Sequence, residues 1–366
     1  MQLKHLQYGF SLIELMISLT LGLLISAAVM QVYLTSIKTS SIQSGGSDIL
    51  EASIFGIQNI EKSIRLSNLG MADTNNPLTP LAGVVMTSDK SLVSSKTDKS
   101  KNNMNGIKMG GTKTAAGTAD ITGEFLTKGG IQASNITDLK SSQLTIQYEA
   151  PQDMYDCEGT LVRGPIEIER EGRLEMIPGQ VIIQRYFLSE VAQSDKANYE
   201  SKIKSYELRC DAGRYIKENL STAELALQKI NDSTILLDSR NIRDFGEIGE
   251  IIIPRVDYFG VLLGVEVIDP STSKVTLRYF TSEEYMSFLK NLEATSSTIT
   301  TDIISVKLSA LVRAERPLTG EAGASKFKIF GDEETLSSDT SNAFIRKVYE
   351  SNIMLRNSRT IKESSI

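Results

Sequence analysis

The chain has 366 residues, so it can bury one large hydrophobic core or two modest ones. Its residues are 40% hydrophobic, 23% charged and 6% aromatic, a composition typical of a folded protein with a loop-rich body that contains β-structure. The formal net charge of -6 gives no overall attraction for a polyanion, so nucleic-acid binding is not the default expectation.

Residues 10–34 form an apolar run in which Glu14 is the only ionisable side chain before Tyr33. As a helix this run would measure roughly 37 Å, enough to cross about 30 Å of hydrocarbon. The alternatives are a buried core helix and a secretory signal removed at Ser26-Ala27-Ala28. A disposable signal has no use for the carboxylate, and a core helix would not lack charge throughout 15–30. The run therefore predicts a retained transmembrane helix.

The residues at the start of this run form a processing site. Gly9 precedes Phe10, and Ser11-Leu12-Ile13-Glu14-Leu15 follow. This arrangement resembles the class III signal of type IV pilins and of type II secretion pseudopilins. The resemblance implies that residues 1–9 are a leader, that a prepilin peptidase cuts after Gly9 on the cytoplasmic side, and that the new N-terminal Phe10 is methylated.

Glu14 is a candidate assembly residue. A carboxylate in an apolar helix costs about 2.5–3.5 kcal/mol at mid-bilayer, and less near a helix end. One turn inside the new terminus, the helix dipole favours an anion. The resemblance implies that its partner is the Phe10 ammonium of a neighbouring subunit during assembly. The alternative is a side chain that merely reaches the membrane interface.

Catalytic and cofactor chemistry find little support in the sequence. Cleavage after Gly9 removes His5, the only histidine, and with it any Ser-His-Asp, Cys-His or histidine-ligated zinc site. The stretch Gly110-Gly111-Thr112-Lys113-Thr114 is not a phosphate-binding loop, because Thr112 precedes Lys113 where the motif needs Gly. No catalytic residue, cofactor or metal is therefore expected, and the chain is not expected to be an enzyme.

The helix is expected to continue beyond the membrane over residues 35–69. One face carries an apolar stripe, with an interruption or kink expected at Gly45-Gly46 and a stop at Asn68-Leu69-Gly70. The stripe comprises Leu50, Ile54, Ile57, Ile60 and Ile64.

A globular head is expected over residues 70–366. Within it, 86–130 has seven lysines against four acidic residues and no sustained periodicity, which indicates a flexible insertion of solvated loops. The rest is rich in strand candidates, at 144–148, 181–188, 205–210, 234–237, 251–253, 261–268, 275–280 and 305–313.

The order of a helix followed by strands predicts an α+β fold. The resemblance to type IV pilins implies the pilin-like form of this fold, with a long transmembrane and spine helix followed by an antiparallel β-sheet head. In the last strand candidate, Val306 and its alternate neighbours are apolar, which predicts burial of one face. Capping-box patterns at Ser221 with Glu224, and at Thr281 with Glu284, predict two short helices in the head.

Several segments of the head resemble the PilW family of minor pilins, in the same order along the chain. That resemblance implies a minor pilin that initiates pilus assembly and supports twitching motility. Its implied partners are PilV-, PilX- and FimU-like minor pilins, the major pilin, a PilY-type tip adhesin and the prepilin peptidase. The segments are 155–159, 256–265, 306–313 and the tail 345–357.

The implied location is the inner membrane, crossed once with the head in the periplasm, and later the pilus filament or its tip. Two alternatives remain open from the sequence. The tail is also similar to that of GspJ-type pseudopilins, which would place the chain in a type II secretion system. A membrane-anchored hydrolase that uses carboxylates alone is the other class, although no motif supports it.

Cys157 and Cys210 are the only cysteines, and both follow the membrane segment. An even pair in an exported domain favours a disulfide over two buried thiols. A disulfide that closes the loop between Cys157 and Cys210 would stabilise the head by about 4 kcal/mol in the loop-entropy model.

The processing site gives a direct prediction. Co-expression with a prepilin peptidase should yield a mature chain that begins at Phe10 with a methylated N-terminus, as read by mass spectrometry. Replacing Gly9 with a bulky residue should leave the precursor uncut but still in the membrane, because a side chain at this position obstructs the extended chain in the protease cleft. An N-terminus at Val29 would instead identify an ordinary signal peptide.

Overall fold

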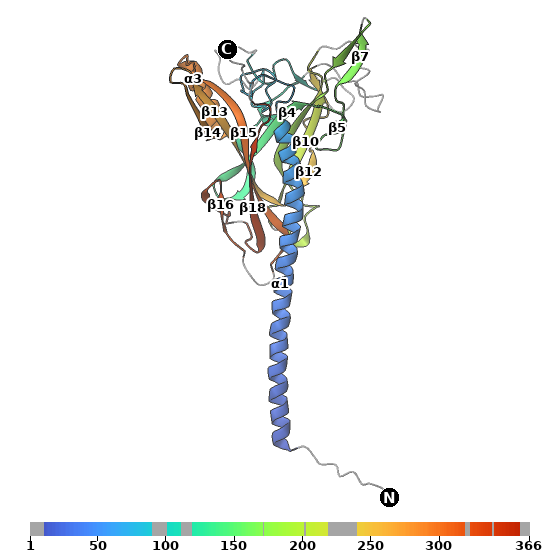
Figure 1. Cartoon of the computed structure of the whole chain (residues 1–366). Coiled ribbons are helices and arrows are strands. Elements are labelled where there is room, and N and C mark those ends of the chain that lie inside the picture. The colour runs from blue at the N-terminus through green and yellow to red at the C-terminus, as the bar shows by residue number, and fades with distance from the viewer. Residues whose placement is uncertain are drawn as a thin grey trace.

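The computed structural model describes residues 11–89, 101–110, 119–170, 172–200, 203–218, 240–318, 323–338 and 340–358. One long helix carries a head of β-sheets around its C-terminal part, and its N-terminal part extends away from the head (Figure 1). This arrangement confirms the α+β fold class expected from the sequence.

Helix α1 runs from Leu12 to Leu66 without a break, a length of 55 residues. It ends at the C-cap residue Ser67, after which Asn68 and Gly70 have φ angles of 69° and 66°. Left-handed backbone at the end of a helix prevents its continuation. The predicted stop at residues 68–70 is therefore confirmed to within two residues.

The interruption expected at Gly45-Gly46 is wrong, because both residues lie inside α1. Gly45 faces the head, and a Cβ atom there would lie 3.2 Å from Cδ1 of Ile345. Gly56 is tighter still, since a Cβ atom would lie 2.2 Å from Cγ1 of Ile253. Gly46, by contrast, has open space beside it. Gly45 and Gly56 thus let the helix approach the strands closely, and their role is packing rather than bending.

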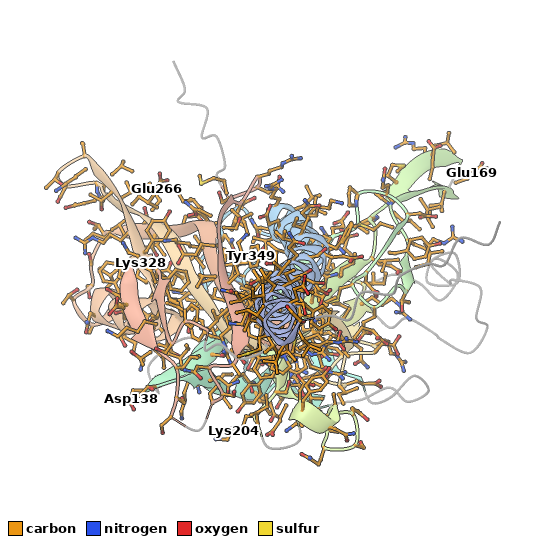
Figure 2. All side chains as sticks on the ribbon, turned by 90° about the horizontal axis from the view of Figure 1, so that it is seen from below. Asp138, Glu169, Lys204, Glu266, Lys328 and Tyr349 are labelled. Carbon is orange, nitrogen blue, oxygen red and sulfur yellow. A yellow bond between two sulfur atoms is a disulfide. The ribbon has the colours of Figure 1, made fainter. Side chains whose placement is uncertain are left out.

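The head contains two antiparallel sheets that flank α1. Viewed along the helix from below, Glu266 on one sheet and Glu169 on a projecting hairpin lie on opposite sides of it (Figure 2). The first sheet has the strand order β12-β10-β9-β4-β3, with bounds Glu250–Ile253, Tyr206–Tyr215, Val181–Glu190, Leu139–Glu149 and Lys128–Ile136. The second has the order β14-β13-β15-β18, with bounds Lys274–Phe280, Val256–Asp269, Thr300–Pro317 and Phe344–Met354.

Shorter elements complete the head. Helix α3, Ser282–Ala294, connects β14 to β15, and the 3-10 turns η1 and η2 span Gly123–Phe125 and Asn198–Glu200. A small sheet joins β1 (Lys108–Met109), β2 (Ala119–Asp120) and β11 (Asn241–Ile242). Three hairpins are β5–β6 (Met154–Tyr155, Leu161–Val162), β7–β8 (Ile166–Arg170, Arg173–Ile177) and β16–β17 (Lys326–Ile329, Asp332–Thr335).

Six of the strands expected from the sequence fall within β4, β9, β12, β13, β14 and β15, and the one expected at 205–210 overlaps β10 from its second residue on. The capping box at the start of α3 is also confirmed. Thr281 Oγ1 accepts the Glu284 N–H at 3.3 Å, and the Glu284 carboxylate accepts the Thr281 N–H at 2.8 Å. The strand expected at 234–237 and the capping box at Ser221 and Glu224 lie outside the described residues.

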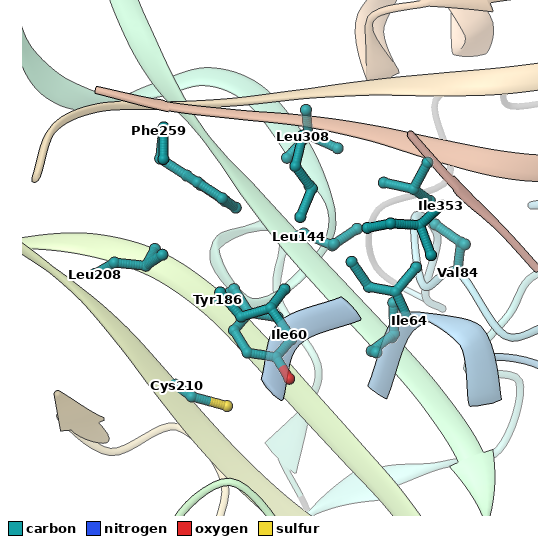
Figure 3. Packing of buried hydrophobic residues seen from close by; sticks show 14 of the residues in the cluster. Ile60, Ile64, Val84, Leu144, Tyr186, Leu208, Cys210, Phe259, Leu308 and Ile353 are labelled. Atoms are coloured by element: carbon teal, nitrogen blue, oxygen red, sulfur yellow. The ribbon is translucent and has the colours of Figure 1, made fainter. Parts of the chain in front are cut away.

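The main core lies where α1 meets both sheets (Figure 3). Ile60 and Ile64 are 1% and 0% exposed, among residues from both sheets that include Tyr186 and Ile353. The lower part of the predicted stripe is different: Leu50 and Ile54 are 43% and 44% exposed, and the helix buries Ile49 instead. The sequence pattern therefore places the packed face correctly from Ile57 to Ile64, but not at Leu50 and Ile54.

The segment 86–130 differs from the solvated loops that were expected. In its described parts, Met104, Ile107, Ile121 and Leu126 are buried in a second core against β9, β10 and β11. Their burial depends on residues distant in the sequence, so the polar composition of the segment did not indicate it. The buried partners are Val85, Val181, Ile183, Tyr215, Ile242 and Phe245.

Strand β15 was expected to bury one face, and it buries both. Val306 faces the main core, while Leu311 packs in a third cluster beneath the β16–β17 hairpin. On the same second face, the Arg313 guanidinium contacts Glu200 at 2.7 Å and is 2% exposed. The hairpin covers a surface that the alternating pattern assigned to solvent.

The glycines of α1 provide a matched test of this packing. Gly56→Ala should destabilise the head by about 1–3 kcal/mol, because the added methyl group meets Ile253 and the Ile252 carbonyl oxygen. Gly46→Ala, in the same helix with open space beside it, should instead stabilise by about 0.5–1 kcal/mol. Urea denaturation of the full-length protein in detergent, followed by circular dichroism, measures both. Equal effects of the two substitutions would contradict the packing role of Gly56.

Candidate functional site

The candidate functional site is the N-terminal half of α1, which extends beyond the head (Figure 1). Every large apolar side chain between Leu12 and Leu34 is at least 50% exposed. The most apolar 18-residue window of the helix has a mean hydropathy of 2.2, and none of it is buried. This part of α1 is long and apolar enough to cross a membrane, and its surface requires lipid or other helices rather than water.

The first turn of α1 is closed by a capping box. Ser11 is the N-cap residue, and its Oγ accepts the Glu14 N–H at 3.3 Å. The Glu14 carboxylate in turn accepts the Ser11 N–H at 3.0 Å. Two of the N–H groups that a helix leaves unpaired at its start are thereby satisfied, and the carboxylate is held at the positive end of the helix dipole.

Sequence reasoning missed this capping box, although the signal was present. Ser11 and Glu14 have the same spacing as Thr281 and Glu284, where the pattern was recognised. The structure thus gives Glu14 a local role within its own chain, in addition to any role in assembly. Gly9 and Phe10 lie outside the described residues.

Polar contacts join the upper end of α1 to the C-terminal strand and the residues after it. Ser351 Oγ donates to Glu61 at 2.6 Å, and the Asn68 amide donates to the Asn357 carbonyl at 2.9 Å. Together with the main core, these contacts attach the helix to the head at the end opposite to its exposed half. The exposed half is therefore presented as a continuous extension of a helix that is fixed in the head.

The disulfide expected from the sequence is confirmed. Cys157 and Cys210 are bonded, with their Cα atoms 6.2 Å apart. The bridge joins the turn between β5 and β6 to β10, one of the inner strands of the five-stranded sheet. It is a structural cross-link, because Cys210 is completely buried and Cys157 packs against the main core.

Acidic side chains surround the disulfide. Burial, followed by the charges of Asp211 and Asp156, raises the pKa of Glu158 to about 8. Burial also raises the pKa of Asp156 and of Asp211, although Asp211 lies 2.9 Å from the Arg185 guanidinium. Across the described ranges, no group of three or more His, Cys, Asp or Glu side chains is arranged to hold a metal ion.

Comparisons with known proteins match both ends of the chain. A family model described as Type IV Pilus-assembly protein W, PilW, matches residues 219–357. A second model, the prokaryotic N-terminal methylation motif, matches residues 4–30. No curated protein matches the chain.

Among solved structures, the chain is similar to a type IV-like pilin from Thermus thermophilus, with 12% sequence identity and a TM-score of 0.23. The similarity covers 64% of this chain and 84% of that chain. The two family models match separate parts of the chain, one at the start of the apolar helix and the other over the C-terminal part of the head.

The pKa of Glu158 predicts how the stability of the head depends on pH. The folded state holds the proton up to about pH 8, whereas an unfolded chain releases it near the ordinary value of 4.5. The resulting stabilisation is complete below pH 4.5, falls between these values and is lost above pH 8. Solvent screening of this half-buried group limits the loss to about 1–2 kcal/mol.

Glu158→Gln should therefore raise the urea midpoint at pH 8 and make its decline from pH 5 to pH 8 less steep. Glu169→Gln, on the projecting β7–β8 hairpin, is the matched control and should leave the pH profile unchanged. A wild-type midpoint that rises over this pH range would contradict the assignment.

Proposed function

We propose that this type IV pilin-like chain is a minor subunit that helps to start assembly of a pilus together with other minor pilins. One observation carries the proposal: the exposed apolar half of α1 begins at the methylation motif and is fixed at its other end in a head that contains the PilW-like region. The matched families are structural components of pili, and the chain is accordingly proposed as a structural subunit rather than an enzyme.

The exposed apolar half of α1 is compatible with two successive environments of the subunit, the membrane and the pilus. Before assembly, lipid would cover the side chains from Leu12 to Leu34, with the leader on the cytoplasmic side and the head in the periplasm. During assembly, the helices of neighbouring subunits would replace the lipid. Both environments satisfy the same apolar surface, so the subunit can pass from one to the other without exposing it to water.

Glu14 supports a mechanism for docking in register. Its Oε2 accepts the Ser11 N–H, and among the described residues its Oε1 has no hydrogen-bond partner. That second oxygen is free to accept the Phe10 ammonium of an adjacent subunit. A pair of this kind adds little net stability, but a displaced neighbour leaves a costly unpaired charge in an apolar environment. The Glu14 carboxylate would therefore determine the register in which neighbouring subunits dock more than the affinity between them.

The size of the head supports a place where few neighbours crowd it. The region 70–366 is larger than a repeating shaft subunit needs, because helically packed neighbours limit the room for each globular domain. The tip or the initiating complex removes that limit. PilV-, PilX- and FimU-like minor pilins, the major pilin and a PilY-type tip adhesin are the proposed partners, and a prepilin peptidase is the proposed processing enzyme.

Deletion of the gene tests the proposal. Surface pili and twitching motility should fall strongly, while the major subunit accumulates in the membrane, and the wild-type gene should restore both. Electron microscopy, motility assays and immunoblots of membranes provide the measurements. Normal piliation combined with a loss of protein secretion would instead support a GspJ-like pseudopilin of a type II secretion system.

The same strain separates the two roles of Glu14. Glu14→Gln keeps an oxygen that can accept the Ser11 N–H but removes the charge, whereas Glu14→Ala removes both. Both variants should still be cleaved, and neither should restore pili or co-purify normally with the other minor pilins. Normal assembly by Glu14→Gln would show that capping, rather than charge pairing, is what assembly requires.

A further inference from the structure

A cleft of about 720 Å³ opens on the head, away from the membrane helix and the disulfide. The edge strand β3, strand β13, the β16–β17 hairpin and the start of α3 surround it. Its lining is apolar along the floor, with Ile131, Leu139, Val261, Leu262 and Ile329. A cleft with this volume and lining has the dimensions of a ligand-binding site and accommodates several side chains of a bound chain.

One wall of the cleft depends on an unusual turn. Phe330 and Gly331 connect β16 to β17 with φ angles of 54° and 108°. A bulky side chain rarely occupies this left-handed conformation, in which Asn or Gly is favoured, and such strained positions cluster at binding sites. Phe330 lines the cleft, so the strained backbone places an aromatic ring at the site.

The floor beside this wall is shaped around a glycine. A Cβ atom at Gly260 would lie 2.8 Å from Cε2 of Phe330 and 2.5 Å from the Tyr258 hydroxyl. The two rings therefore meet over Gly260, and no larger residue fits there. Tyr258 also lines the cleft, where it supplies a polar group at the edge of the apolar floor.

The charge of the hairpin wall is negative. Glu334 is half-buried, and its charge contributes, after burial, to raising the pKa of Tyr258. Among the residues that the structure describes, the Glu334 carboxylate has no ion pair or hydrogen bond. Asp332 lies on the same wall, and Asp138 marks the tip of the β3–β4 turn at the rim (Figure 2). Lys128 on β3 and Lys140 on β4 also line the cleft, so its negative charge is concentrated on the hairpin side. A half-buried carboxylate over an apolar floor favours a cationic partner.

The opposite wall is a strand edge. β3 is the last strand of its sheet, and both of its ends are occupied. The Gly129 N–H donates to Ser282 Oγ at 2.6 Å, and just beyond the other end the Thr137 N–H donates to the Thr335 carbonyl at 2.9 Å. Between these contacts, Gly130 and Ile131 border the cleft. A short extended segment can lie along this stretch, as a strand does when it adds to a sheet edge.

We propose that this cleft binds an extended, basic segment of a partner protein. Apolar side chains of the segment contact the floor and the Phe330 ring, and a Lys or Arg side chain reaches Glu334. Alternation along an extended chain lets one set of side chains face the apolar lining while the other set reaches Glu334. The proposal does not depend on the role in pilus assembly, and its failure in a binding assay leaves that role untouched.

Fluorescence anisotropy with the full-length protein in detergent tests the proposal. The probe is a labelled octapeptide, Lys-Val-Arg-Val-Lys-Val-Thr-Lys, and its counterpart has Glu in place of each Lys and Arg. The basic peptide should bind with micromolar affinity, and the acidic peptide at least about tenfold more weakly. No binding of the basic peptide, or equal affinity of the two, would overturn the proposal.

Two variants examine the walls of the cleft separately. Glu334→Gln should weaken binding of the basic peptide about tenfold and reduce its dependence on salt. Glu333→Gln is the control, because Glu333 is exposed next to it on β17 and pairs with Lys326 at 2.7 Å. It should leave binding unchanged.

Phe330→Asn distinguishes binding from folding. Asn suits the positive φ angle, which offsets the loss of the ring's packing against the third cluster, so the head should stay folded with a cooperative urea transition. Peptide affinity should fall about tenfold because the ring is lost. Undiminished affinity in either Phe330→Asn or Glu334→Gln would contradict the assignment. Self-association in sedimentation experiments that Glu334→Gln abolishes would assign the cleft to a second copy of this chain and would also overturn the proposal.

Discussion

Packing of the C-terminal part of α1 against both main sheets, with Gly56 allowing a close approach to Ile253, is the interaction that organises the head. Among the described residues, the two main sheets share no backbone ladder, and their inner faces are joined by side chains that pack on one another and around the C-terminal part of the helix. Ile60 and Ile64 occupy the centre of this packing. Because one element serves as the core of the head and as the apolar extension, the orientation of the head relative to that extension is set by a single helix.

A second constraint lies on the far face of β15. Asp257 contacts the guanidinium of Arg346 at 2.5 Å, and Arg313 contacts Glu200 at 2.7 Å, all in buried positions. These pairs connect β13, β15, β18 and the short turn η2. Removal of one partner would leave a buried charge without compensation, which destabilises far more than the intact pair stabilises. The network therefore fixes which strands meet, in a sheet whose apolar surfaces alone are less selective.

Much of this fold could be predicted from local sequence patterns. The rest could not, because it depends on contacts between residues that are far apart in the sequence. The apolar run, the stop after Leu66 and the strands rich in β-branched residues carry periodicity or capping signals that need no tertiary context. Segment 86–130 carries none. There the Asn103 side-chain oxygen accepts the Met86 N–H at 2.8 Å. A residue type that is common in solvated loops thus supplies the hydrogen-bond partner of a buried backbone N–H group.

The candidate site was only partly accessible to the same reasoning. The methylation motif and the isolated carboxylate of Glu14 are visible in the sequence, and the Ser11 capping partner was visible but unrecognised. The cleft was not predictable, because Tyr258, Gly130 and Phe330 come together only when β3, β13 and the β16–β17 hairpin are assembled. A site formed by strands from separate parts of a chain cannot be recognised from the spacing of residues within any one segment.

The position of the disulfide has a consequence for cleavage of the backbone within the head. The bridge between Cys157 and Cys210 encloses the β7–β8 hairpin, which projects from the head and exposes Leu174 and Met176 (Figure 1). A single backbone cut in that hairpin would separate the chain into two pieces that remain covalently joined. Strand β9 would also stay paired between β4 and β10. A head cut in this hairpin would thus remain covalently attached to α1.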